Sequence, residues 1–308
     1  RILIDTGDKN VPDYQTNLTQ VLKSEQADIE HIIVTHWHHD HIGGVEDIYG
    51  SIAIRHTLAG TRWLPRVISN GKNSIARFAR WELNPGPHAP RSCLPPRDQR
   101  GSYLNYTIIS GQPKVWKFER SQDDDPDELP SNVPINWLSD GQEFKVEGAT
   151  VKVHHTPGHT TDHVVLTLLE EDTLFSGDCI LGEGTAVFED LHSYMQSLHK
   201  ISDLNPKVIY PGHGNIKPIE KIKYYIAHRN QREEQILKAL KLNKDVQLNA
   251  MELVKLIYTD TPEHLWPAAA YNVNHHLTKL TKEKKIYCTS VDGELKWVFF
   301  FNCNCYTI

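Results

Sequence analysis

The sequence holds little cysteine and no long apolar run, and each absence excludes a class of protein. Five cysteines are scattered over 308 residues, too few and too far apart for the disulfide framework of a small secreted domain. We therefore expect a reducing, intracellular compartment. No stretch approaches the roughly 20 consecutive apolar residues that cross a bilayer, so we expect no membrane segment. At roughly 150 residues per domain, the length fits one large domain or two ordinary ones.

The net charge of -6 conceals a difference between two parts of the chain. Residues 217–308 contain 14 lysines and arginines against 10 acidic residues, whereas residues 1–216 contain 19 against 29. A basic C-terminal part favours a polyanionic partner, although an ordinary solvated helical surface would have the same composition.

Apolar runs and turn residues predict alternating helices and strands over most of the chain. The first residues already read as a buried strand that runs into a polar turn, and we expect the true N-terminus to lie upstream. Helices are predicted at 14–24, 189–201 and 219–241, and strands at 29–35, 115–118, 135–138, 144–146, 150–154, 164–169, 173–175 and 208–210. Residues 55–112 break the pattern, because they are rich in arginine, contain six prolines and have few periodic apolar positions. This composition predicts an unstructured insertion.

Histidine is unusually frequent, with 18 residues, and four of them are packed together. His36, His38, His39 and His41 fall within six residues, directly after a predicted buried strand. Imidazole and carboxylate groups are ligands that zinc accepts, and Asp40 adds the carboxylate. The H-x-H-x-D-H run can therefore divide its ligands between two adjacent ions, with His36 and His38 facing one ion, and Asp40 and His41 the other. A site beyond the carboxyl end of a strand is common in layered α/β folds.

This run, with the two glycines that follow it, resembles the signature of the metallo-beta-lactamase superfamily. Three further motifs occur in the order of that family: Thr156-Pro157-Gly158-His159-Thr160, Phe175-Ser176-Gly177-Asp178 and Tyr210-Pro211-Gly212-His213-Gly214. The resemblance implies an α/β fold, the four-layer αββα sandwich, whose first strands would lie upstream of this chain. It also implies two zinc ions per chain. The implied ligands are His36, His38 and His159 for the first zinc, Asp40, His41 and His213 for the second, and Asp178 as the bridge.

The resemblance indicates two domains. We predict a metallo-beta-lactamase domain over residues 1–216, interrupted by the insertion at 55–112, and a second domain over residues 217–308. In the second domain a helix, a helix, a basic turn and a strand resemble the small winged-helix-like domain of this group. They are expected at 251–258, 272–280, 282–286 and 295–298.

Three strings, at residues 34–38, 175–184 and 226–233, are similar to the animal lactamase-beta-2 group. That resemblance implies an endoribonuclease acting on single-stranded RNA, in the mitochondrial matrix or cytoplasm, with no obligatory protein partner evident. A hydroxide held between two zinc ions would be the nucleophile. We expect Asp40 to orient it as well as bind metal, and His213 to protonate the leaving group.

Side chains near the predicted wing fit an RNA partner. A basic cluster would hold the phosphates, and its expected members are Lys279, Lys282, Lys284 and Lys285 with His275 and His276. Tyr271 and Tyr287 would stack on unpaired bases, or alternatively pack in the core of the small domain.

Other interpretations remain open from the sequence. A glyoxalase-II-type thioesterase shares the same ligand motifs, but we see no clear basic set for a glutathione moiety. A nucleic-acid-binding module without catalysis is disfavoured, because it has little physical reason to keep seven converging ligands. We expect His39 to face solvent, Cys179 to be a buried small side chain, and the C-x-C pair at 303–305 not to bind metal. His163 is a candidate for orienting a metal ligand or the substrate.

Overall fold

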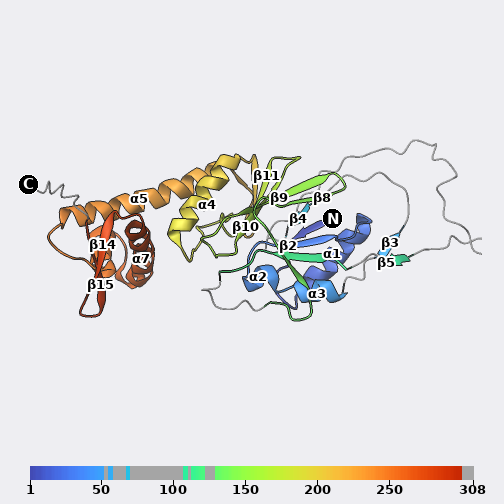
Figure 1. The fold of residues 1–308 in the computed structure, drawn as a ribbon, viewed down its shortest axis with the longest axis horizontal. Helices are drawn as coiled ribbons and strands as arrows, with labels where there is room; N and C mark the ends of the chain where they lie inside the picture. The colour runs from blue at the N-terminus through green and yellow to red at the C-terminus, as the bar shows by residue number, and fades with distance from the viewer. Residues whose placement is uncertain (52–54, 58–66, 70–106, 110–111, 122–128, 300–308) are drawn as a thin grey trace, which may run out of the picture. The chain divides into compact units, whose positions relative to one another are not determined.

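A computed structural model describes residues 1–51, 55–57, 67–69, 107–109, 112–121 and 129–299 (Figure 1). The chain divides into two compact units. The first comprises Arg1–Ala186 and Asn205–Ile219, and the second comprises Val187–Leu204 and Glu220–Ile308. The predicted domains had their boundary after residue 216 and assigned residues 187–204 to the first domain, whereas the contacts group that segment with the second unit.

The first unit contains a parallel sheet of five strands in the order β4-β1-β2-β6-β7. Its strands are β1 (Ile2–Ile4), β2 (His31–Val34), β4 (Val67–Ser69), β6 (Lys114–Lys117) and β7 (Ile135–Trp137). The helices of this unit are α1 (Pro12–Ser24), α2 (His39–Ile42) and α3 (Val45–Ser51).

A second sheet of six strands has the order β13-β12-β11-β10-β9-β8. Its neighbours are antiparallel except for the parallel pair β11 and β12. The strands are β8 (Glu143–Val146), β9 (Ala149–His155), β10 (Val164–Leu168), β11 (Thr173–Gly177), β12 (Val208–Pro211) and β13 (Lys217–Pro218).

The two sheets share one hydrophobic core. Ile2 and Ile4 of β1 and Ile33 of β2 pack in the same cluster as Val151 of β9 and Phe175 of β11. Successive residues of a strand point to opposite faces of the sheet, so Leu3 and Ile32 face away from this core. Strands that are buried on both faces read as continuous apolar runs, as these do.

The other face of the parallel sheet packs on helices. Leu3 of β1 and Ile32 of β2 join Leu18 of α1 and Ile48 of α3 in a second buried cluster. This sheet is therefore fixed on both faces, and the loops that leave the carboxyl ends of its strands start from rigid positions.

The predicted insertion at 55–112 is described at only a few points, and there the prediction of a structureless segment is wrong. β4 pairs in parallel with β1, from Ile2↔Val67 to Ile4↔Ser69, and so extends the sheet beyond β1. An uncovered edge strand offers unpaired backbone groups to such an addition. The short strands β3 (Arg55–Thr57) and β5 (Thr107–Ile109) pair with each other. The rest of the segment, like the C-x-C pair at 303–305, lies outside the described residues.

The second unit consists of helices and a hairpin. It contains α4 (Leu191–Leu204), α5 (Glu220–Leu242), α6 (Ala250–Ile257), a 3₁₀ turn (Glu263–Leu265), α7 (Trp266–Lys282), β14 (Ile286–Val291) and β15 (Glu294–Phe299). Asn249 begins α6 with a capping box that includes Glu252. Leu248 bridges to Trp297, so a third segment joins the hairpin. Among the described residues we find no helix with the length and hydropathy needed to cross a membrane.

Candidate metal centre

Three histidines from both sheets point their ring nitrogens at one position. The Nε2 of His36 lies 3.0 Å from Nδ1 of His38 and 3.2 Å from Nε2 of His159. The remaining pair, His159 and His38, is 3.1 Å apart. Zinc binds imidazole nitrogen at about 2.0 to 2.1 Å, so tetrahedral ligands lie about 3.3 Å from one another. The three nitrogens fit such an ion, with Asp178 as the fourth member of the group.

A second group adjoins the first. It comprises Asp40, His41 and His213, whose candidate ligand atoms all lie within 4.8 Å of one another. Nε2 of His213 is 2.9 Å from Oδ2 of Asp40 and 3.4 Å from Oδ2 of Asp178. The Nε2 of His41 faces Oδ1 of Asp178 at 3.4 Å. Within the described part of the chain, these last two atoms are buried without a hydrogen bond. Asp178 therefore has one carboxylate beside both groups, as the predicted bridging ligand requires.

All seven predicted ligands follow the carboxyl ends of strands. The run from His36 to His41 leaves β2 of the parallel sheet, and His159, Asp178 and His213 follow β9, β11 and β12 of the other sheet. Glycines let these loops approach closely. A Cβ atom on Gly44 would lie 2.3 Å from the carbonyl oxygen of Thr6, and one on Gly212 would lie 2.5 Å from Oδ1 of Asp178. Any side chain at either position would displace the loop.

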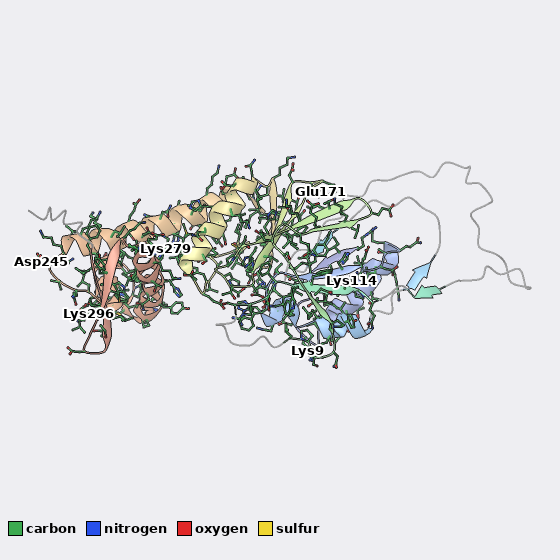
Figure 2. All side chains as sticks on the ribbon, viewed as in Figure 1. Lys9, Lys114, Glu171, Asp245, Lys279 and Lys296 are labelled. Atoms are coloured by element: carbon green, nitrogen blue, oxygen red, sulfur yellow. The ribbon has the colours of Figure 1, made fainter. Side chains whose placement is uncertain are left out.

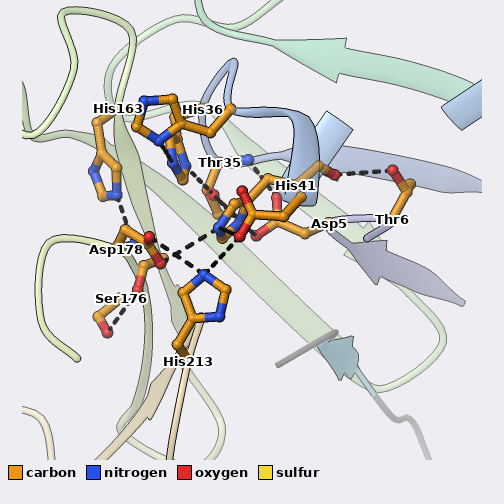
Figure 3. A network of polar contacts seen from close by, with 12 residues as sticks. Asp5, Thr6, Thr35, His36, His41, His163, Ser176, Asp178 and His213 are labelled. Atoms are coloured by element: carbon orange, nitrogen blue, oxygen red, sulfur yellow. Dashed lines mark hydrogen bonds and ion pairs between the residues drawn. The ribbon is translucent and has the colours of Figure 1, made fainter. Parts of the chain in front are cut away.

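Asp5 is a site residue that the sequence analysis missed. It is buried at the end of β1, and its Oδ2 lies 2.8 Å from Nδ1 of His41 (Figure 3). Thr35 fixes the carboxylate, because its backbone N–H and its hydroxyl donate to the two oxygens of Asp5 at 2.7 and 2.9 Å. The carboxylate holds the proton of His41 on Nδ1 and leaves Nε2 to face the metal position. The sequence feature that could have identified Asp5 is its position as an acidic residue directly after a buried strand.

His163 orients a ligand rather than joining the ligand set. Its Nε2 accepts a hydrogen bond from the backbone N–H of Asp178 at 3.2 Å. Its Nδ1 lies 3.0 Å from the hydroxyl of Thr156, which fixes the ring in place. A Cβ atom on Gly177 would lie 2.7 Å from this Nε2, so the glycine makes room for the histidine.

Two other predicted residues take no part in the ligand groups. The side chain of His39 is 90% exposed and lies 3.5 Å from Asp8. Cys179 is fully buried, and burial raises the pKa of its thiol, so the sulfur stays protonated. Both results match the roles expected from the sequence.

The environments of the histidines set opposite protonation states. Burial and the neighbouring imidazoles hold the pKa of His36 well below its ordinary value, and the same causes lower that of His38 to about 4. Burial also acts on His41, but the charges of Asp5 and Asp178 outweigh it and raise its pKa to about 10. Hydrogen bonds to Asp178 and Asp40 raise the pKa of His213 to about 9.

The two carboxylates are held ionised. The hydrogen bond with His213 is the main cause that lowers the pKa of Asp40. For Asp178 burial works in the opposite direction, but the adjoining imidazoles of His213 and His41 lower its pKa overall. Buried neutral imidazoles next to ionised carboxylates are the donor set that a divalent cation takes.

Comparison with known proteins assigns the family. The sequence profile described as Metallo-beta-lactamase superfamily matches residues 1–213, and that described as Beta-lactamase associated winged helix domain matches residues 250–296. The chain belongs to the metallo-beta-lactamase superfamily and carries the associated winged-helix domain. A relative from Drosophila melanogaster, named Beta-lactamase-like protein 2 homolog, is 46% identical and covers 97% of this chain and 84% of its own length. One of the same name from Caenorhabditis elegans is 38% identical, with coverage of 92% and 75%.

Solved structures support the fold. A beta-lactamase domain protein from Burkholderia ambifaria has a TM-score of 0.61 at 16% identity, covering 97% of this chain and 82% of its own. A metallo-beta-lactamase family protein from Thermus thermophilus has a TM-score of 0.52 at 21% identity, covering 97% and 89%. The predicted α/β fold with a C-terminal winged-helix domain is confirmed. Family and ligand groups together indicate a divalent metal site and a metal-dependent hydrolase.

The four lysines predicted to bind RNA do not form a free basic surface. Lys279, labelled in Figure 2, lies on α7. It is buried and pairs with Glu233 and Glu283. Lys285 pairs with the same two carboxylates, at 2.9 and 2.8 Å. Lys282 pairs with Asp190 at 3.0 Å. Only Lys284 is described as exposed without such a pair, so acidic residues of the same unit neutralise most of the cluster.

The two tyrosines predicted to stack on bases are exposed, whereas one of the two histidines of the cluster is buried. The exposed fractions of Tyr271 and Tyr287 are 61% and 53%, so neither packs in the core. His276 is buried, and its burial, together with the charge of Arg229, lowers its pKa to about 3. His275 contacts Tyr271 edge to face, with ring centroids 4.6 Å apart.

Proposed function

We propose that the chain is an endoribonuclease that cleaves phosphodiester bonds of single-stranded RNA at a dinuclear zinc centre. The observation that carries this proposal is the pair of adjoining ligand groups, with Asp178 beside both. Two ions placed in this way suit an in-line displacement at phosphorus, in which both the attacking and the leaving oxygen need charge stabilisation. The exposed Tyr271 and Tyr287 support a single-stranded substrate, because unpaired bases stack on aromatic side chains.

The residues of the chain would divide the remaining work. Zinc bound in these groups would supply a water of lowered pKa as the nucleophile. Asp40 belongs to the second ligand group and is held ionised, so its carboxylate can orient that water by accepting a hydrogen bond from it. The side chain of His213 is 27% exposed, and with Nε2 bound to the metal its Nδ1–H is the proton that it can give to the leaving oxygen. We further propose that the enzyme acts inside the cell, in the mitochondrial matrix or cytoplasm, without an obligatory protein partner.

The test compares two neighbouring histidines. His38→Ala removes a predicted ligand, whereas His39→Ala removes an exposed histidine outside both groups. We expect two zinc ions per chain in the wild type and in His39→Ala, with cleavage of a labelled single-stranded RNA in both. His38→Ala should lose zinc and lower cleavage by about 100-fold or more. A zinc-loaded wild type that leaves the RNA intact would overturn the proposal.

A thioesterase is the second candidate, because a metal pair also polarises an acyl carbonyl. A relative from Aspergillus chevalieri named Atrochrysone carboxyl ACP thioesterase is 28% identical and covers 98% of this chain and 79% of its own length. Hydrolysis of S-lactoylglutathione and of an acyl-carrier thioester should be measured beside RNA cleavage, with the same two variants. Thioester hydrolysis that His38→Ala abolishes, without RNA cleavage, would select this candidate.

A further inference from the structure

An arginine stacks on an aromatic ring directly beside the ligand groups. The guanidinium carbon of Arg120 lies 4.5 Å from the centroid of the Trp37 ring. The indole of Trp37 is in turn 4.9 Å from the imidazole of His38, ring centroid to ring centroid. Trp37 lies between two ligands in the sequence, and Arg120 follows β6 at the carboxyl edge of the parallel sheet. Neither residue is a member of a ligand group.

The segment that carries Arg120 is anchored to the loop of another ligand. Phe118 stacks on His155, with centroids 4.0 Å apart and planes at 5°. Nε2 of His155 lies 2.8 Å from the carbonyl oxygen of Thr161, and the backbone N–H of Ser121 donates to the hydroxyl of Thr161 at 3.4 Å. Thr161 lies two positions after His159, so these contacts fix the position of Arg120 relative to the metal centre.

The chemistry of this pair suits an anionic group of the substrate. A guanidinium that lies over an indole is held by cation–π attraction, and its N–H donors lie in its own plane. That planar fork matches the oxygens of a phosphate better than a lysine ammonium does. Trp37 and Arg120 are both partly exposed, so a substrate can reach them. Arg120 belongs to neither ligand group, so its expected role is binding rather than chemistry.

We propose that Arg120, stacked on Trp37, binds a phosphate adjacent to the scissile one along the substrate strand. This inference rests on the proposed endoribonuclease function and adds a binding position to it. Arg120 would place the scissile linkage against the metal centre through its neighbour, so the residue should contribute mainly to KM. A substrate that lacks the neighbouring charge should not benefit from it.

The experiment removes each partner of the contact in turn. The cleavage site in a short labelled RNA is mapped, and the linkage on either side of it is then replaced by a neutral methylphosphonate. For the wild type, we expect replacement on one side to lower kcat/KM by about tenfold. For Arg120→Gln, we expect kcat/KM on the unmodified RNA to be about tenfold lower than for the wild type. Replacing the same linkage by methylphosphonate should then lower it little further. Arg120→Lys should fall between the two, because it keeps the charge without the planar fork.

Controls separate this contact from general effects. Lys145→Gln removes an exposed positive charge elsewhere in the same unit and should behave as the wild type does. Zinc content and the thermal midpoint of each variant report a lost site or a lost fold. If Arg120→Gln and the methylphosphonate lower kcat/KM independently, so that their losses multiply whichever side is replaced, the inference is wrong while the proposed function stands. A wild type that cleaves no RNA overturns both.

Discussion

At the scale of single residues, the centre depends on groups that never touch a metal. Asp5 fixes the tautomer of His41, and His163 holds the backbone of Asp178. The first contact is buried and the second is partly buried, and hydrogen bonds are stronger in such surroundings than in water. The position of a ligand is thus determined by its neighbour as much as by its own backbone.

Replacement of Asp5 should weaken metal binding. Asp5→Asn keeps the size of the side chain but removes the charge that holds the proton of His41 on Nδ1. Loss of such an outer partner costs about 10- to 100-fold in metal affinity. Competition with a chromophoric zinc chelator measures this affinity, and Asp8→Asn, a change close in sequence, is the matched control. Equal zinc affinity in Asp5→Asn and the wild type would refute the role.

Zinc uptake should release protons. With pKa values raised to about 10 and about 9, His41 and His213 are protonated near neutral pH without metal. Each must lose the proton on Nε2 to become a ligand, so about two protons per chain should leave on binding at pH 7.5. Their release should decline as pH rises through 9 and 10. Calorimetric titration in buffers of different ionisation enthalpy counts these protons, and a count near zero at pH 7.5 would contradict the assigned ligands.

Each of the ligands predicted from the sequence is tied to a short motif. The structure brings together all seven, since the motifs mark the ends of strands that meet at one edge. Asp5 has no such motif, and its role depends on a contact with a residue 36 positions away. The ion pairs of the lysine cluster were missed for the same reason, because Glu233 meets Lys279 from 46 positions away.

At the scale of elements, a buried ion pair connects α5 to α7. Lys279 and Glu233 are 7% and 9% exposed, so their charges have little access to water. Removal of one partner of a buried pair leaves the other charge without compensation. The pair therefore helps to hold α7 against α5.

Lys279→Met should destabilise the second unit by about 3 to 5 kcal/mol. Lys296→Met is the control, because Lys296 makes only a 3.9 Å contact with Glu294, and its loss should cost about 1 kcal/mol or less. Urea unfolding followed by circular dichroism gives both values. The double variant with Glu233→Met should recover much of the loss, and a single variant as stable as the control would contradict the account.

Glu283 should make this unit sensitive to acid. Burial acts to raise its pKa, but hydrogen bonds from Lys285 and Lys279 outweigh it and lower the pKa from 4.5 to about 2. A carboxyl whose pKa is depressed by folding stabilises the protein above its unfolded pKa, and this contribution is lost as pH falls through the folded value. The thermal midpoint should therefore fall between pH 4.5 and 2, less steeply in Glu283→Gln. Identical pH profiles for the two proteins would exclude Glu283 as the cause.

The apolar periodicity of the sequence predicted the helices of the second unit better than its strands. The helices at α4, α5 and α6 lie close to their predicted ranges, because each buries one regular face. β14 was missed, since only Ile286 among its residues is buried and the rest give no alternating pattern. Similarly, β4 gains its structure from pairing with β1, which no local pattern in a proline-rich segment reveals.

At the scale of the whole molecule, the ligand groups connect the two sheets of the first unit. His36, His38, Asp40 and His41 follow the parallel sheet, and the other three ligands follow the six-stranded sheet. A cation held by both sets would cross-link segments more than 100 residues apart in sequence, such as His36 and His159. Metal binding is therefore coupled to the packing of the sandwich.

Zinc should accordingly stabilise the fold as well as supply chemistry. A ligand that binds only the folded state adds about 2.7 kcal/mol at a free concentration 100 times its Kd, so zinc should raise the thermal midpoint and EDTA should lower it. His38→Ala should lose most of this response, because one nitrogen of the three-histidine group is gone, while His39→Ala should keep it. Differential scanning calorimetry with and without EDTA measures the shift. Midpoints that do not respond to EDTA in the zinc-loaded wild type would show that the two sheets are held together without the metal, and that the ligand groups contribute nothing to stability.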